Sequence, residues 1–290
     1  MAMNWPTFFT RLGSAVVFAA VMMCGLLWKD WMFVVLVGVI MVLCLREYFK
    51  LTRMLSRREI SFPAVIVTYV IGIIWLFLFS RYSDANYWYP GGAASDADKW
   101  YEYRQWSSAM QITAWAMLFT VAFYIIVFVR LGGWWTLLSL VYIILPCCLL
   151  VMMQQISKYI PLILILCIWM NDTMAYIVGS FIGKTPFSKI SPKKTWEGTI
   201  GGALLAVVGA AVAAHFIPGQ PMPLYIALAL CAAIAGTAGD LFESKLKRMA
   251  GVKDSGTMMP GHGGALDRFD SLLVATPFAF CAVYLVQAFT

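Results

Sequence analysis

Charged residues are scarce in this chain. Asp, Glu, Lys and Arg make up 12% of its 290 residues, whereas a soluble domain carries about 25%. Hydrophobic residues reach 62%, and apolar runs recur along the whole chain. The composition therefore excludes a soluble protein with one anchor, and it predicts an all-α polytopic membrane protein.

Three familiar sequence patterns are also missing. The seven cysteines lie in apolar runs without a C-x-x-C spacing, which argues against disulfides and a metal site. Gly179 and Gly183 are separated by three residues where a P-loop needs four, and no predicted strand precedes them. The first apolar run has no small-x-small cleavage motif behind it, so we expect it to be retained as a helix.

A helix that crosses a membrane needs about 20 mostly apolar residues, and nine segments of the chain meet this requirement. They are residues 12–28, 31–48, 62–81, 109–130, 133–153, 158–183, 198–217, 222–244 and 268–289. With the N-terminus in the cytoplasm, most of the 21 Lys and Arg residues fall on the inner side, as the positive-inside rule expects. The five on the outer side are Lys29, Arg81, Lys99, Arg104 and Lys158. We therefore expect nine spans, a cytoplasmic N-terminus and an outer C-terminus.

Polar residues divide the chain into two parts. Residues 1–155 contain about five spans joined by plain loops. Residues 156–290 contain about four spans, nearly all the intramembrane charge, and two predicted cytoplasmic loops, 184–197 and 245–267. Because charge inside a membrane is costly and usually functional, we expect the second part to be catalytic.

The first polar group is Asn171-Asp172, which interrupts an apolar run. Asp172, Tyr176 and Gly179 are spaced to share one helix face, and Gly183 extends it. A face that combines a carboxylate with glycines should lie against protein or a cavity rather than lipid. Helix–helix packing is the alternative explanation of the glycines.

The second polar group is a cationic loop that leads into a helix. Ser191 fits an N-cap and Pro192 fits the first helical position. The polar residues that follow are Lys193, Lys194, Thr195 and Glu197. Lysine is disfavoured in a first helical turn unless an anion such as phosphate binds there. The positive-inside rule alone explains the lysines but not Thr195 or Glu197.

The third polar group forms one stripe along a helix that should continue past the membrane. Its members are Asp240, Glu243, Ser244 and Lys247. A salt-bridged helix end would explain Glu243 and Lys247, which are four residues apart. It would not explain Asp240, which lies deeper.

The fourth group is KDSGTMMPGHGGALDRFDS, residues 253–271. Asp267 and Asp270 are three residues apart at the start of the last helix, so their carboxylates project from one side. Glycines around His262 allow a close approach of the backbone to a ligand. Carboxylates beside a cationic loop are what a Mg²⁺–phosphate site needs, although carboxylates at a helix start also complement the helix dipole.

The stretch SKLKRMAGVKDSGTMMPGHGGALDRFD, residues 244–270, resembles the signature of the phosphatidate cytidylyltransferases. Met259 and Ala265 are its two departures, and neither changes a charged position. The segments ISPKKTWEG and NDTMAYIVG also resemble the family. The resemblance is strong over 160–290 and only topological over 1–155.

The resemblance implies transfer of a cytidylyl group from CTP to phosphatidic acid, which yields CDP-diacylglycerol and pyrophosphate with Mg²⁺. It also implies an all-helical homodimer, and metal binding by Asp240 and Asp267 with Asp270 near. Whether a second, monovalent cation shares the site is left open by the sequence. We assign catalytic roles to Lys253, Asp254, His262 and Arg268. We assign substrate binding to Asn171, Asp172, Ser191, Lys193, Lys194, Thr195, Glu197, Ser244, Lys247 and Arg248.

Two alternatives remain at this stage. One is a CTP-dependent lipid kinase, or a synthase that joins CDP to another lipid; the other is an ion-coupled transporter. The expected partners are CTP, phosphatidic acid and membrane lipids, with no nucleic acid. We expect an integral protein of a bacterial inner membrane, with its active site on the cytoplasmic side.

Overall fold

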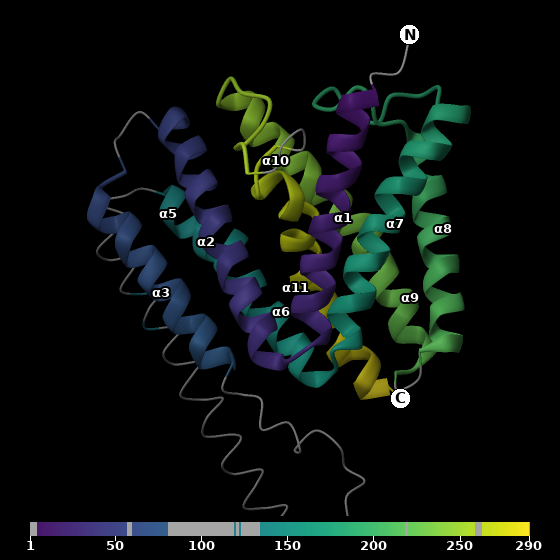
Figure 1. The fold of residues 1–290 in the computed structure, drawn as a ribbon, viewed down its shortest axis with the longest axis horizontal. Coiled ribbons are helices and arrows are strands. Elements are labelled where there is room, and N and C mark those ends of the chain that lie inside the picture. The colour runs from purple at the N-terminus through teal and green to yellow at the C-terminus, as the bar shows by residue number, and fades with distance from the viewer. Residues whose placement is uncertain are drawn as a thin grey trace, which may run out of the picture.

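The computed structural model describes residues 5–56, 60–80, 134–217, 220–258 and 263–289, together with Phe119 and Ala122 (Figure 1). These residues form helices and loops and contain no β-strand. The helices are α1 (Trp5–Leu27), α2 (Asp30–Leu55), α3 (Phe62–Ser80), α5 (Trp134–Ser139), η3 (Leu140–Ile144), α6 (Leu145–Ile156), α7 (Tyr159–Ile182), α8 (Trp196–Phe216), α9 (Met222–Cys231), η4 (Ala232–Gly236), α10 (Thr237–Met249) and α11 (Leu266–Phe289). The all-α prediction is confirmed for the part of the chain described.

Seven helices among the described residues are long and apolar enough to cross a membrane. They include two composite helices, Trp134–Ile156 and Met222–Met249. Helix α1 contributes a shorter apolar stretch, Gly13–Leu27. The predicted span 109–130 lies outside the described residues except for Phe119 and Ala122, so the count of nine stays a prediction.

Both composite helices contain a π-helical segment, η3 and η4. A π segment shifts the side chains that follow it around the helix axis, and such segments are frequent at functional sites. Segment η4 is made of small residues, AAIAG, and it immediately precedes α10. It therefore sets the direction in which the polar stripe of α10 points.

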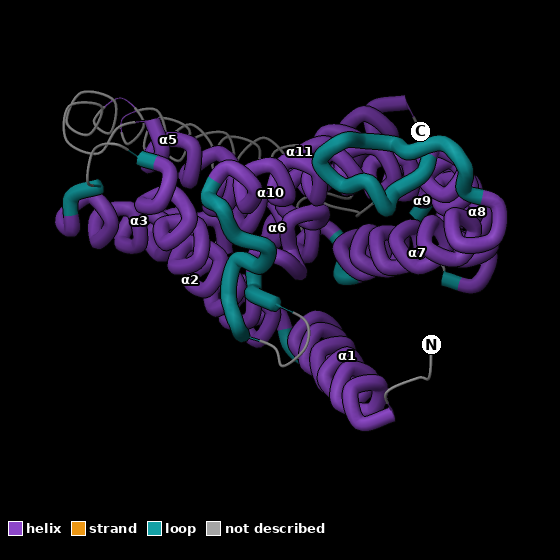
Figure 2. The backbone as a smooth tube through the Cα atoms, turned by 90° about the horizontal axis from the view of Figure 1, so that it is seen from above, coloured by secondary structure: helices purple, strands orange, loops and turns teal. Residues whose placement is uncertain are grey.

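Glycines bring α7 and α8 into close contact (Figure 2). A Cβ atom on Gly198 would lie 2.6 Å from the Ala175 carbonyl oxygen, and one on Gly202 would lie 2.7 Å from the Asn171 carbonyl oxygen. Gly179 faces the same interface, since its Cβ would lie 3.0 Å from Thr195 Oγ1. Helix packing therefore accounts for Gly179, and α8 fixes the backbone of the Asn171 segment.

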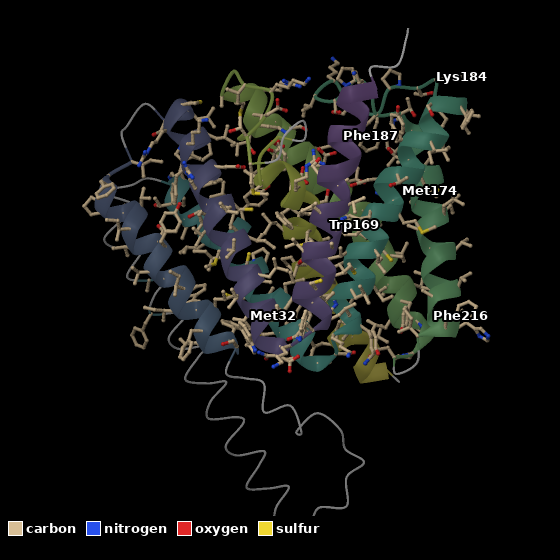
Figure 3. All side chains as sticks on the ribbon, viewed as in Figure 1. Met32, Trp169, Met174, Lys184, Phe187 and Phe216 are labelled. Carbon is tan, nitrogen blue, oxygen red and sulfur yellow. The ribbon has the colours of Figure 1, made fainter. Side chains whose placement is uncertain are left out.

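Helix α11 lies inside the bundle and contacts α2, α6, α7, α9 and α10. The α10–α11 loop, the α7–α8 loop and the end of α2 all lie at one end of the molecule (Figure 1). Figure 3 places Lys184 and Phe187 at this end and Met32 and Phe216 at the other. The fold therefore gathers three of the four predicted polar groups at one end.

Candidate active site

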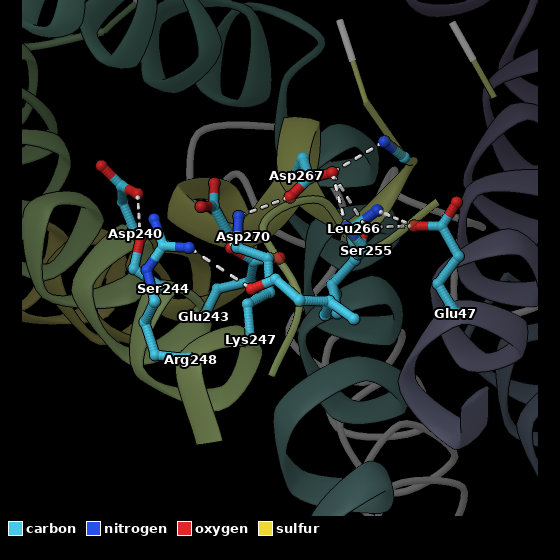
Figure 4. A network of polar contacts seen from close by, with 12 residues as sticks. Glu47, Asp240, Glu243, Ser244, Lys247, Arg248, Ser255, Leu266, Asp267 and Asp270 are labelled. Carbon is cyan, nitrogen blue, oxygen red and sulfur yellow. Dashed lines mark hydrogen bonds and ion pairs between the residues drawn. The ribbon is translucent and has the colours of Figure 1, made fainter. Parts of the chain in front are cut away.

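The site begins where α10 meets the loop before α8. Lys194 forms an ion pair with Asp240 Oδ2. Ser244 Oγ, one turn further along α10, donates a hydrogen bond of 3.4 Å to Asp240 Oδ1 (Figure 4). Two predicted groups, separated by 46 residues in the chain, therefore meet here.

A second ion pair links α10 to the start of α11. Lys247 Nζ lies 2.5 Å from Asp267 Oδ1, and it also pairs with Glu243 one helical turn away. Glu243 is fully buried. Removing one partner of such a buried cluster typically costs about 3–5 kcal/mol, because an unpaired charge remains. The expected Glu243–Lys247 pair is confirmed, but Asp267 makes it part of a larger cluster.

Asp267 also organises the loop that precedes α11. Its Oδ2 accepts hydrogen bonds from the Ser255 amide at 3.0 Å, the Ser255 hydroxyl at 3.1 Å and the Gly264 amide at 2.7 Å. Gly263 has φ of 84°, which disfavours other residues, and its added Cβ would lie 2.5 Å from this oxygen. The sequence predicted that glycines here let the backbone approach a ligand. Gly263 instead lets the backbone approach the Asp267 carboxylate.

Glu47 of α2 is a residue that sequence reasoning missed. Its carboxylate accepts hydrogen bonds from Ser255 Oγ at 2.6 Å, the Ala265 amide at 2.9 Å and the Leu266 amide at 2.8 Å. The last two amides belong to the start of α11, where backbone N–H groups lack helical partners. The first half of the chain thus holds the signature loop in place, although we expected it to provide only spans.

Asp172 and Asp270 approach the same centre from α7 and α11. Asp270 is buried, and its Oδ1 accepts the Ser271 amide at 2.6 Å. Its carboxylate interacts electrostatically with Asp240 and Asp172. Asp172 in turn interacts with the charges of Lys194 and Arg268. Three helices and the α7–α8 loop therefore contribute charges to one centre.

The predicted start of α8 is wrong. The helix begins at Trp196, and Thr195 is its N-cap, with Oγ1 accepting the Gly198 amide at 3.2 Å. Ser191 is instead the first residue of a turn, since its carbonyl accepts the Lys194 amide at 3.1 Å. Proline suits the second position of such a turn as well as a first helical turn, and here the turn prevails. The lysines therefore precede the helix.

Other predicted residues have local or exposed positions. Glu197 binds its own loop, accepting the Thr185 hydroxyl at 2.8 Å and the Lys184 amide at 3.1 Å. Tyr176 is 78% exposed, so the prediction that its helix face is enclosed is wrong at this position. Four more predicted residues are exposed: Lys193, Arg248, Lys253 and Asp254. Asn171 is buried, and His262 lies outside the described residues.

A metal would have to share carboxylates that already have partners. Within the described ranges, no group of three or more His, Cys, Asp or Glu side chains is arranged to hold a metal ion. Mg²⁺, however, is commonly bound by one or two carboxylates together with substrate phosphates and water. The charges of Asp240 and Asp270 repel each other, and a cation bound near both would relieve that repulsion. Asp267 fits such a site less well, because its oxygens accept four bonds from the protein.

Comparison with known proteins places this geometry in context. The model of the cytidylyltransferase family matches residues 9–286. The chain is 30% identical over 293 residues to the phosphatidate cytidylyltransferase of Haemophilus influenzae, which covers 92% of this chain and 96% of the relative. It is 33% identical over 243 residues to the enzyme of that name from Bacillus subtilis, covering 80% and 82%. Over 129 residues it is 43% identical to the Aquifex aeolicus phosphatidate cytidylyltransferase.

Proposed function

This chain belongs to the cytidylyltransferase family, and we propose on that premise that it transfers a cytidylyl group from CTP to phosphatidic acid. The products are CDP-diacylglycerol and pyrophosphate, and the place of the reaction is phospholipid biosynthesis. The main structural support for the proposal is a pair of ion pairs at one end of the bundle, Lys194–Asp240 and Lys247–Asp267. Cations and carboxylates alternate there, as a site for two phosphate-bearing substrates requires.

In this reaction an oxygen of the phosphatidate phosphate attacks the α-phosphorus of CTP. The bond from that phosphorus to the α–β bridging oxygen breaks, and pyrophosphate leaves. The attacking oxygen is already anionic near neutral pH, so no strong general base is needed. The protein's task is to align two anions and to stabilise their charge.

The cations near the centre suit that task. Lys194 and Lys247 are held by carboxylates, so their ammonium groups are positioned before a substrate arrives. Exposed Lys193 and Arg248 stand beside them in the sequence and extend the positive charge toward solvent. We assign these four residues, with Arg268, to the phosphates of CTP and phosphatidate.

We further propose that Mg²⁺ binds at Asp240 and Asp270, with Asp267 adjacent. When bound, Mg²⁺ neutralises charge on the phosphates and lowers the barrier to their approach. Lys194 pairs with Asp240 in this site. Isothermal titration of the protein with Mn²⁺ should show binding to wild type that weakens at least tenfold in Asp240→Asn. Equal affinity of the two proteins would contradict the assignment.

Purified protein given CTP, phosphatidate and Mg²⁺ should release pyrophosphate and form CDP-diacylglycerol. Asp240→Asn and Asp267→Asn should each reduce turnover by orders of magnitude, and their melting temperatures show whether the loss reflects unfolding. Release of CDP instead of pyrophosphate would identify a lipid kinase. Flux across liposomes without CTP turnover would identify a transporter.

The placement of the protein is also a proposal. Nine spans, a cytoplasmic N-terminus and a bacterial inner membrane fit the charge distribution of the loops and the bacterial relatives. In that orientation the polar end faces the cytoplasm, where CTP is available. A homodimer is expected from the family resemblance, and light scattering in detergent would measure it.

A further inference from the structure

A basic cavity lies beside α2. Glu47 and Ser255, two of its lining residues, are at the opposite end of the polar network from Asp240 (Figure 4). The volume of the cavity is about 740 Å³, and it is lined by α2, by α3 and by the loop after α10. Ser255 and Gly256 form the loop side of this cavity. The predicted reaction does not use it.

Three cations of α2 line the cavity. Arg46, Lys50 and Arg53 are four and three residues apart, so they project from one side of the helix. All three are exposed, and none forms a hydrogen bond or ion pair with another residue in the described part of the chain. Glu47 is the one acidic lining residue, and its carboxylate is occupied by Ser255 and two backbone amides. Three cations and one carboxylate therefore line the cavity, so its described lining has a net positive charge.

Apolar side chains line much of the rest of the cavity. Leu43, Phe49, Val65 and Tyr69 line the cavity on α2 and α3, both of which are long and apolar enough to cross a membrane. Leu43 and Arg53 are ten residues apart, which corresponds to about 15 Å along the helix, roughly half the hydrocarbon thickness of a bilayer. A soluble anion needs no such wall, whereas a lipid has an acyl chain to place on it.

We propose that this cavity binds an anionic phospholipid in addition to the lipid that reacts. Its phosphate would lie on Arg46, Lys50 and Arg53, and an acyl chain would lie against Leu43 and Val65. Basic pockets between membrane helices at the cytoplasmic side are suited to anionic headgroups. The proposal goes beyond the transfer reaction, because it concerns a lipid that is not consumed.

The bound lipid would also contact the loop that carries the signature. Ser255 lines the cavity, and its hydroxyl lies between two carboxylates, 2.6 Å from Glu47 Oε2 and 3.1 Å from Asp267 Oδ2. A lipid that fills the cavity would restrict this loop and so steady Asp267. Anionic lipid content of the membrane would then affect turnover at the neighbouring site.

Native mass spectrometry of the full-length protein tests binding without any turnover. Phosphatidylglycerol is the probe, and phosphatidylcholine with the same chains is the neutral control. Wild type should retain phosphatidylglycerol, and Arg46→Gln/Lys50→Gln/Arg53→Gln should bind it at least tenfold more weakly. The matched variant Lys184→Gln/Lys189→Gln/Lys245→Gln removes three exposed cations at the same end outside the cavity, and it should bind like wild type.

If the triple variant unfolds, Arg53→Glu replaces it in the binding assay, because it is a single change at an exposed position. Unchanged phosphatidylglycerol binding in either cavity variant overturns the proposal. Displacement of the lipid by glycerol phosphate or CTP at equal concentration would show a site for soluble anions and would also overturn it. Since the assay measures lipid binding without turnover and contains no phosphatidate, an inactive transferase would leave this result unaffected.

Discussion

At the scale of single residues, the spacing of polar residues along the chain was enough to single out Asp240, Lys247 and Asp267 as candidates. Spacing along one helix face explains the Glu243–Lys247 pair, whereas the Lys247–Asp267 pair joins two helices and does not follow from that spacing. Glu47 could not be predicted, because its partners lie 208–219 residues away in the chain. Its one signal was a lone carboxylate in an apolar span, surrounded by arginine and lysine.

Glu47→Gln tests the role of this missed residue. The amide keeps one acceptor oxygen and places an N–H₂ group beside amides that need an acceptor. Hydrogen bonds to a charged group are worth about 1.5–3 kcal/mol, so we expect the start of α11 to open more readily. Hydrogen exchange at Ala265 and Leu266 should accelerate at least tenfold, and pyrophosphate release should fall with it.

Asp30→Asn is the matched control for this substitution. Asp30 is at the opposite end of the same helix, where its Oδ1 accepts a 2.7 Å hydrogen bond from Gln154. Exchange at Ala265 and Leu266 should stay as in wild type. If Glu47→Gln leaves exchange and turnover unchanged, Glu47 does not hold the loop.

At the scale of helices, span positions could be predicted because apolar run length is a direct physical requirement. The predicted 62–81 and 158–183 correspond to Phe62–Ser80 and Tyr159–Ile182. The start of α8 was misplaced, because proline is compatible with both a helix start and a turn. The π segments carry no local sequence mark, since they depend on how neighbouring helices pack.

Gly202→Ala tests the close contact of α7 and α8. Its Cβ would meet the Asn171 carbonyl oxygen at 2.7 Å and the Ala175 amide nitrogen at 2.8 Å, and backbone atoms cannot move aside cheaply. Overpacking of this kind costs about 1–3 kcal/mol. We expect a lower melting temperature and reduced turnover, because Asp172 moves with Asn171.

Gly209→Ala makes the same change two turns along α8. There the new Cβ meets only the flexible end of Met170, and alanine is the better helix former by up to about 1 kcal/mol. This variant should keep its melting temperature and activity. Equal destabilisation of the two variants would show that helix propensity, rather than the α7–α8 contact, decides the outcome.

At the scale of the whole molecule, the number of predicted spans was enough to predict that the polar loops lie at one end. Parity of the spans places successive loops on alternate sides, and the α7–α8 and α10–α11 loops lie together as that parity requires (Figure 1). The fold does not determine which end of the molecule faces the cytoplasm. That orientation is predicted only from the charge of the loops.

Cysteine labelling in intact cells tests that orientation. Helix α7 has 24 residues, so it is about 36 Å long and crosses a hydrocarbon core of about 30 Å. Lys158 precedes it and Lys189 follows it, and both side chains are exposed. A membrane-impermeant maleimide should label Lys158→Cys in intact cells and Lys189→Cys only after permeabilisation. The native cysteines lie in apolar helices, so the unsubstituted protein should give a low background. The reverse pattern would invert the topology and place the Asp240 centre outside, away from cytoplasmic CTP, which would contradict the proposed reaction as well as the orientation.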